Sequence, residues 1–236
     1  MQFIFIILLL GMMFILVLIF MNVIDYKTVL PIFTSALGSF FGAGMAFYIS
    51  DSKEKNDKIK KEIDGANKAL FVIAAQIETF ILMQKMTSSY IDDKKNYDIA
   101  AMKLPAIQIP DYSDLKVDMA DLYMFIGDNP DILKKILAHQ TAFSDFLKLC
   151  KNRAEFYDSA ILPLVESNKL KGKNISFDEL KEVFGEMKYE KNLSFTKNIY
   201  VRNGELLDSF NILFSEVRLA MKHKYPKEKF IAMETS

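Results

Sequence analysis

The chain has few of the residues on which disulfide, metal and catalytic chemistry depend. Its 236 residues include one cysteine, Cys150, two histidines, His139 and His223, and no tryptophan. A single cysteine cannot form an internal disulfide, which fits a reducing compartment. Neither histidine has neighbours at the spacing of zinc ligands. The sequence therefore excludes a disulfide scaffold and a zinc site of cysteine and histidine.

An excess of either charge is also absent. The 30 lysine and arginine residues balance 30 aspartate and glutamate residues, so bulk electrostatics favours no binding of nucleic acid. The sequence contains no glycine-rich phosphate loop, no Gly-x-Ser-x-Gly elbow and no His-Glu-x-x-His pair. Four aspartates lie close together, but their spacing fits no calcium loop and we interpret them as solvated: Asp111, Asp114, Asp118 and Asp121. We expect a protein that is not an enzyme and uses no cofactor, metal or small-molecule substrate.

Two long apolar runs are present, at residues 3–24 and 28–50. A hydrocarbon core of about 30 Å requires about 20 helical residues, because lipid offers no partner to an unpaired backbone group. Each run is long enough to span a bilayer. Beyond residue 50 the chain is rich in charged residues and long enough for one compact domain. The sequence thus predicts a transmembrane hairpin over residues 1–50 and a cytoplasmic helical domain over residues 51–236.

The flanking residues predict how the hairpin is retained and oriented. We expect no cleaved signal peptide, because no basic residue precedes the first run and no small-x-small pattern follows Val23. Five lysines follow the second run, whereas the short connector has Lys27 alone: Lys53, Lys55, Lys58, Lys60 and Lys61. The positive-inside rule then places both termini in the cytoplasm. We interpret these lysines as juxtamembrane anchors, with direct contact to anionic headgroups as the alternative.

Small residues form a strip along the second run. They recur at four-residue spacing in two adjacent columns: Ser35, Ser39 and Ala43 in one, and Gly38, Gly42 and Ala46 in the other. Such strips let helices approach closely in lipid, where dispersion contacts drive association. The strip either packs against the first run of the same chain or joins subunits of a homo-oligomer in the bilayer.

The first half of the cytoplasmic domain is expected to begin with a long helix. Apolar residues recur at three- and four-residue steps from Ile59 to Met83, with a weak point at Gly65 that would allow a bend. Residues 92–114 are predicted to form a connector, in which Pro105 and Pro110 bracket one extended edge segment, residues 106–109. A short helix is predicted over residues 118–126, before the Gly-Asp-Asn-Pro turn.

The second half contains two further long helices. The first is predicted from residue 129 or 130 to about 167, with a kink at Pro163. Ser176 and Glu179 form a capping box that opens a short helix to about Phe184. The last long helix is predicted over residues 193–223, stopped by Pro226. The expected fold is therefore all-α, a two-helix transmembrane hairpin followed by an antiparallel bundle of three long helices with short connecting helices.

Two basic stretches are candidates for binding a partner. One is the loop with Lys169, Lys171 and Lys173; the other is the tail with Lys222, Lys224, Lys227 and Lys229, interleaved with Tyr225 and Phe230. Basic residues beside aromatic rings can hold single-stranded nucleic acid. Because the domain is neutral overall, we interpret both stretches as solvated surface.

The layout of the whole chain resembles a kind of bacterial membrane protein. The hairpin ending in Ser35-Ala-Leu-Gly-Ser-Phe-Phe-Gly-Ala-Gly-Met-Ala-Phe47, the basic exit, the proline-bracketed connector and the Phe-rich helical domain are similar to two-span effectors of phage defence, particularly those of retrons. The resemblance implies that a reverse transcriptase and its RNA-linked DNA restrain the protein until phage activity disturbs them. Release then damages the inner membrane and halts the infected cell, as in abortive infection.

A second function belongs to another class. The chain would then be a constitutive membrane-anchored scaffold, whose helical domain docks a cytosolic partner and whose spans hold it in place. Bulky replacements along Gly38, Gly42 and Ala46 discriminate the two functions, because a scaffold should tolerate them and an assembling effector should not.

Overall fold

The computed structural model describes Met13, Val17, Phe20 and residues 26–91, 96–107, 110, 112, 114–127, 129–173 and 176–233. The chain divides into two compact units, Met1–Lys60 and Lys61–Ser236. The sequence placed the domain boundary where the apolar run ends, after residue 50. The first buried residue among the described residues of the long helix that runs through both units is Glu62, which lies just after the division at residue 60.

Helix α2 (Tyr26–Ser88) contains 63 residues and includes both the second apolar run and the helix predicted after it. Pro31 lies inside the helix, in the second turn of its described length, and therefore removes one backbone hydrogen bond. The helix is continuous at Gly65, where the sequence allowed a bend. The glycine instead permits a close approach, because a Cβ atom there would lie 3.2 Å from both the Cβ and the carbonyl oxygen of Asp121.

This approach predicts that two helical glycines respond differently to substitution. At Gly204 no described atom lies within 4 Å of an added Cβ, so G204A should stabilise the second unit by about 1 kcal/mol through helix propensity. We expect G65A to gain little, since the added methyl presses on Asp121, and G65L to lose about 1–3 kcal/mol by overpacking. Urea unfolding followed by circular dichroism measures the three variants. Equal gains for G65A and G204A would contradict the close approach.

The connector contains a helix that the sequence did not predict. Helix α3 (Tyr97–Lys103) begins at Asn96, whose side-chain oxygen accepts hydrogen bonds from the amides of Asp98 and Ile99 at 3.2 and 3.4 Å. Of the predicted extended segment 106–109, residues 106 and 107 are not in a strand, and residues 108 and 109 lie outside the described residues. Helix α4 (Met119–Ile126), capped by Asp118, confirms the predicted short helix.

The second long helix ends differently from the prediction. Helix α5 (Pro130–Phe156) is followed by the π-helix η1 (Tyr157–Ile161) and helix α6 (Leu162–Ser167). The amide of Leu162 donates to the carbonyl of Tyr157, five residues before it. Pro163 has no amide hydrogen for the carbonyl of Ser159, so regular α-helical bonding is interrupted at this turn. The expected kink at Pro163 is a π-turn just before it.

The last two helices follow local sequence signals. Helix α7 (Phe177–Phe184) has the predicted capping box, in which the amide of Glu179 donates to Ser176 Oγ at 3.2 Å and the amide of Ser176 donates to Glu179 Oε2 at 2.9 Å. Helix α8 (Glu186–Lys224) begins earlier than predicted, directly after Gly185 at φ 75°. The described secondary structure is helical throughout, so the all-α prediction is confirmed.

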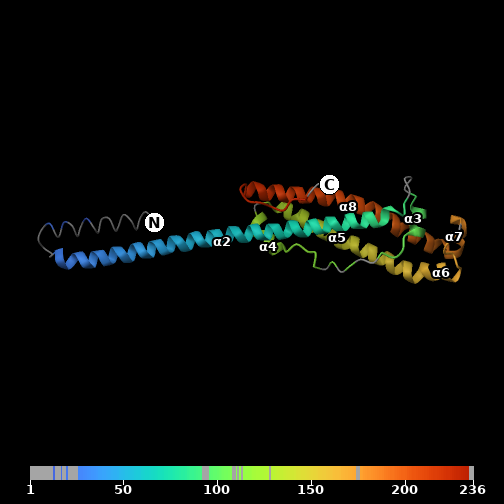
Figure 1. Ribbon diagram of the computed structural model, residues 1–236, viewed down its shortest axis with the longest axis horizontal. Coiled ribbons are helices and arrows are strands. Elements are labelled where there is room, and N and C mark those ends of the chain that lie inside the picture. Colours follow the sequence, from blue (N-terminus) through green and yellow to red (C-terminus); the bar gives the residue numbers. More distant parts are fainter. Residues whose placement is uncertain are drawn as a thin grey trace. The chain divides into compact units, whose positions relative to one another are not determined.

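In the second unit, α2, α5 and α8 lie side by side (Figure 1). Contacts between α2 and α8 join Glu62 to Tyr225 near one end and Phe80 to Asn203 further along. Between α5 and α8, hydrogen bonds join Lys135 to Glu216 and Arg153 to Thr196. Helix α8 is therefore antiparallel to both α2 and α5, and these two helices are parallel to each other.

Because α2 and α5 are parallel, the chain between them must return along the length of the bundle. Residues 104–117 make this return without regular structure where they are described. Their backbone groups need partners, since buried carbonyls are costly when unpaired. Gln76 of α2 supplies one such partner, as its Nε2 donates to the carbonyl of Leu115 at 2.8 Å.

Candidate functional site

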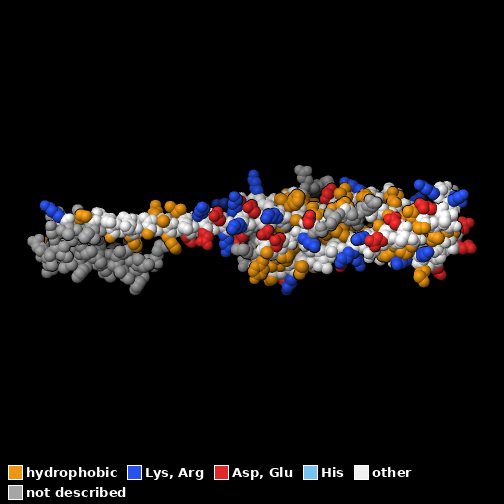
Figure 2. All heavy atoms as spheres, turned by 90° about the horizontal axis from the view of Figure 1, so that it is seen from below, with side chains coloured by type: hydrophobic (Ala, Val, Ile, Leu, Met, Phe, Trp, Pro, Cys, Tyr) orange, Lys and Arg blue, Asp and Glu red, His pale blue; other side chains and the backbone are white. Residues whose placement is uncertain are grey.

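The first unit contains an apolar stretch of α2 whose side chains are exposed. Large side chains between 39% and 69% exposed occur throughout it: Phe40, Phe41, Met45, Phe47, Tyr48 and Ile49. Figure 2 shows hydrophobic side chains along this part of α2. Water penalises such a surface, because about 25 cal/mol is lost for each Å² of apolar area left exposed. Burial of this stretch by lipid or by protein would therefore be favourable.

Membrane spanning is consistent with the size of this helix. Within the described residues one helix, Thr34–Ser88, is long and apolar enough by length and composition to cross a bilayer. A buried core helix or a signal sequence can pass the same test. The predicted first span, residues 3–24, lies outside the described residues except for three isolated positions. One candidate spanning helix is thus described, not two.

The small-residue strip lies on this exposed part of α2. All six of its members are exposed: Ser35, Gly38, Ser39, Gly42, Ala43 and Ala46. No described atom lies within 4 Å of a Cβ added to Gly38 or Gly42. Whether the strip meets the first run or a second subunit stays a prediction.

The lysines predicted to flank the membrane are all exposed. They follow the apolar stretch on α2 at the positions expected: Lys53, Lys55, Lys58, Lys60 and Lys61. Lys55 Nζ lies 2.7 Å from Asp51 Oδ2, one turn before it. Exposed pairs of this kind contribute little to stability, so the lysines are available for interfacial contacts.

The buried part of the second unit contains a charged group that sequence reasoning missed. Arg153 of α5 is 0% exposed, and its guanidinium donates three hydrogen bonds. They reach the carbonyls of Leu104 and Pro105 at 2.6 and 2.7 Å and Thr196 Oγ1 at 3.1 Å. Among the described residues no carboxylate lies within 4 Å of it. Burial lowers the pKa of Arg153 to about 10, so it stays charged at neutral pH.

A sequence signal for Arg153 exists in hindsight. It follows Phe146 by seven positions and Cys150 by three, so it lies on the buried face of α5. An arginine on such a face needs fixed acceptors. These come from the two residues that follow α3, a helix that the sequence had not predicted.

Helix α8 also donates hydrogen bonds to α3. The carbonyl of Ala101 would bond the amide at position 105 in a continuing helix, but Pro105 has no amide hydrogen. Asn192 Nδ2 donates to this carbonyl instead, at 2.8 Å. One turn away, Tyr189 Oη donates to Asp98 Oδ1 at 2.7 Å. The buried side chains of Tyr189 and Asn192 thus hold α3 against α8.

The end of α8 is attached to α2 near the start of the second unit. Glu62 is 7% exposed and receives a hydrogen bond from the hydroxyl of Tyr225, while Lys224 Nζ lies 3.2 Å from the same carboxylate. Further along, the amide of Ile231 donates to Asn67 Oδ1 at 3.2 Å. The basic tail is therefore partly packed against α2 rather than wholly solvated.

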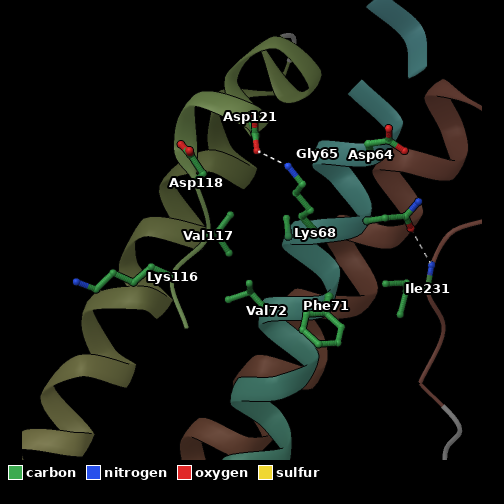
Figure 3. Close-up of a pocket in the computed structure, with 12 residues that line it drawn as sticks. Asp64, Gly65, Lys68, Phe71, Val72, Lys116, Val117, Asp118, Asp121 and Ile231 are labelled. Atoms are coloured by element: carbon green, nitrogen blue, oxygen red, sulfur yellow. Dashed lines mark hydrogen bonds and ion pairs between the residues drawn. The ribbon is translucent and has the colours of Figure 1, made fainter. Parts of the chain in front are cut away.

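A small groove of about 660 Å³ lies between α2 and residues 116–121 (Figure 3). Two of the four clustered aspartates lie here, and each has a structural partner. Asp121 Oδ2 lies 3.6 Å from Lys68 Nζ, and Asp118 Oδ1 accepts a bond from the amide of Ala120 at 2.8 Å. Among the described residues no three histidine, cysteine or carboxylate side chains are grouped as metal ligands would be.

The single cysteine and one histidine also have structural positions. Cys150 is 1% exposed, and burial raises the pKa of its thiol to about 12, which makes it a poor nucleophile. His139 is half-buried on α5, with its ring nitrogens 2.7 Å from the carbonyl of Lys135 and from Ser209 Oγ.

Comparison with protein-family models, with curated protein sequences and with solved structures finds no match to this chain. The features that bear on function are therefore the exposed apolar stretch of α2, the lysines that follow it and the surfaces of the second unit.

Proposed function

We propose that this protein is a non-enzymatic effector of a retron-type anti-phage system in the bacterial inner membrane. It is a multi-pass protein with spans at about residues 3–24 and 28–50, and both termini face the cytoplasm. The observation that carries the proposal is the exposed apolar surface of α2, followed directly by five exposed lysines. This order of surfaces matches the bilayer core and its cytoplasmic interface.

The proposed activity is assembly in the bilayer. Close packing along the small-residue strip joins subunits into a homo-oligomer that perturbs the membrane. A reverse transcriptase with RNA-linked DNA binds the cytoplasmic unit of the resting state and keeps it from assembling. Such a restraint acts only if the partner has different affinities for the resting and assembled states. Open space at Gly38 and Gly42 among the described residues supports a surface reserved for another helix.

The strip can be tested by enlarging its small residues. The triple variant G38L/G42L/A46L keeps the helix apolar and should still insert, but its leucines prevent close helix approach. We expect overexpression of the natural sequence to depolarise cells and stop growth, and the variant to do neither. A membrane-potential dye and viable counts measure the effect, and membrane fractionation verifies insertion.

The matched control replaces large apolar residues of the same helix. F41L/M45L/F47L alters three exposed apolar side chains without enlarging the strip, so it should remain as toxic as the natural sequence. Two results contradict the proposal and favour a scaffold. One is equal toxicity of the strip variant; the other is normal polarisation and viability of cells with the natural sequence, even after phage infection.

A further inference from the structure

The second unit has a groove of about 1400 Å³ at the end formed by α3, α6 and α7. Its floor is apolar and continues into the smaller hydrophobic core, which is centred on Ile161, Leu180 and Phe184. Small-molecule pockets usually measure about 300–1,000 Å³. The size of the groove therefore fits a segment of a polymer better than a single metabolite.

Lysines dominate the rim of the groove. Four of them line it, whereas Glu166 is the one carboxylate among its lining residues: Lys103, Lys169, Lys171 and Lys173. Among the described residues these lysines have no carboxylate within 4 Å, so their charge is not neutralised locally. Glu179, nearby on α7, is engaged in the capping box with Ser176. The groove thus complements an anionic ligand.

The loop that carries three of these lysines is fixed by its own backbone. Lys169 at φ 51° and Gly172 at φ 79° both have left-handed conformations. The amide of Leu170 donates to the carbonyl of Val165 at 2.9 Å, and that of Lys173 to the carbonyl of Leu170 at 3.1 Å. The lysines are therefore presented at alternate positions of a defined turn.

Besides the buried Phe184, three aromatic residues line the groove: Tyr90, Tyr157 and Phe177. Phe177 is 39% exposed, and Tyr157 is held by the Arg153 guanidinium, which lies 5.4 Å from the centre of its ring. Aromatic rings offer stacking surfaces to bases of any sequence, each worth about 1–3 kcal/mol. An acidic peptide needs the lysines and the apolar floor but gains little from these rings.

We propose that this groove binds single-stranded nucleic acid, with phosphates at the four lysines and bases stacked on its aromatic rings. Few hydrogen-bonding groups line it besides the lysines, so binding is tolerant of sequence. The fold brings together what the sequence separates, because Lys103 comes from α3 and the other lysines follow α6. The proposal goes beyond the membrane activity and does not depend on it.

The test uses the full chain in nanodiscs of uncharged phosphatidylcholine and a fluorescein-labelled oligothymidylate of about 12 nucleotides, a typical site size. Anisotropy gives Kd as a function of salt. Four phosphate contacts predict a slope of about −3 for log affinity against log salt, because each contact with a single strand contributes about −0.7. K169Q/K171Q/K173Q should reduce the slope to about −1.

Matched variants distinguish binding in the groove from the effect of net charge and from binding to an aromatic ring elsewhere. K134Q/K188Q/K197Q makes the same change in net charge at exposed lysines outside the groove and should bind as the natural sequence does. F177L should bind at least about fivefold more weakly, whereas F71L, which removes an exposed ring on α2, should not.

Several results would overturn the proposal. The first is absence of oligonucleotide binding, and the second is an equal loss in the two triple-lysine variants. Unchanged binding by F177L excludes base stacking at that ring. Competition by polyglutamate of equal charge that is as effective as unlabelled oligothymidylate would identify the groove as a site for acidic proteins instead.

Discussion

Replacing Arg153 by methionine is expected to lower the free energy of unfolding of the second unit by about 2–4 kcal/mol, because the carbonyl groups that its guanidinium binds lose their donors. Methionine approximates the volume of the side chain but donates no hydrogen bond. The buried carbonyl of Leu104 and the partly buried carbonyl of Pro105 would then lose their present donors, and the loss at a buried carbonyl costs about 1–3 kcal/mol. Urea unfolding of the protein in nanodiscs, followed by far-ultraviolet circular dichroism, measures the change.

Two controls separate geometry from charge. R153K keeps the charge but lacks the planar fork that reaches three acceptors, so it should recover only part of the loss. R202M removes an exposed arginine of α8 and should change stability by less than about 0.5 kcal/mol. A cost for R153M no greater than that for R202M would show that the connector is held without the guanidinium.

Arg153 also connects stability to the basic groove. Pro105, whose carbonyl it holds, and Tyr157, whose ring it contacts, both line that groove. Without the guanidinium, the carbonyl of Pro105 loses its hydrogen bond and the ring of Tyr157 loses its cation contact, so both parts of the groove are less well positioned. R153K should therefore bind oligothymidylate more weakly than the natural sequence while remaining folded, as a positioning residue would.

Local signals explain what the sequence predicted well. The capping box at Ser176, the Asp118 cap of α4 and the three-and-four periodicity of α2 act within one or two turns, so the sequence alone specifies them. The sequence did not predict helix α3, because Pro105 and Pro110 indicated a connector without helix. The signal for α3 is the Asn96 cap, which lies before both prolines.

Tertiary contacts explain what was missed. The role of Gly65 depends on Asp121, more than fifty positions later, and that of Arg153 on carbonyls almost as far before it. The basic loop was recognised, but its rings and Lys103 come from other elements. Solvation was therefore the natural interpretation of three lysines seen alone.

The aromatic centre of the second unit gives the other large prediction. Phe80 of α2 is 0% exposed, and its ring centre lies 5.6, 5.3 and 5.1 Å from those of Phe143, Phe146 and Phe210. These rings come from α5 and α8, so one side chain joins all three long helices. F80A should cost about 3–5 kcal/mol, since it removes buried area, leaves a cavity and breaks three edge-to-face contacts. The same unfolding experiment measures it.

Variants matched to F80A distinguish the ring from its volume and from its helix. F80L fills most of the space but has no ring, so we expect it to cost less than F80A and still more than F71A. F71A removes a phenylalanine of the same helix that is 63% exposed and should cost less than about 1 kcal/mol. Similar losses for F80A and F71A would mean that α2 does not pack on α5 and α8. Such a result would contradict the ring contacts of Phe80 with Phe143, Phe146 and Phe210, because truncating a ring packed among them must leave a cavity.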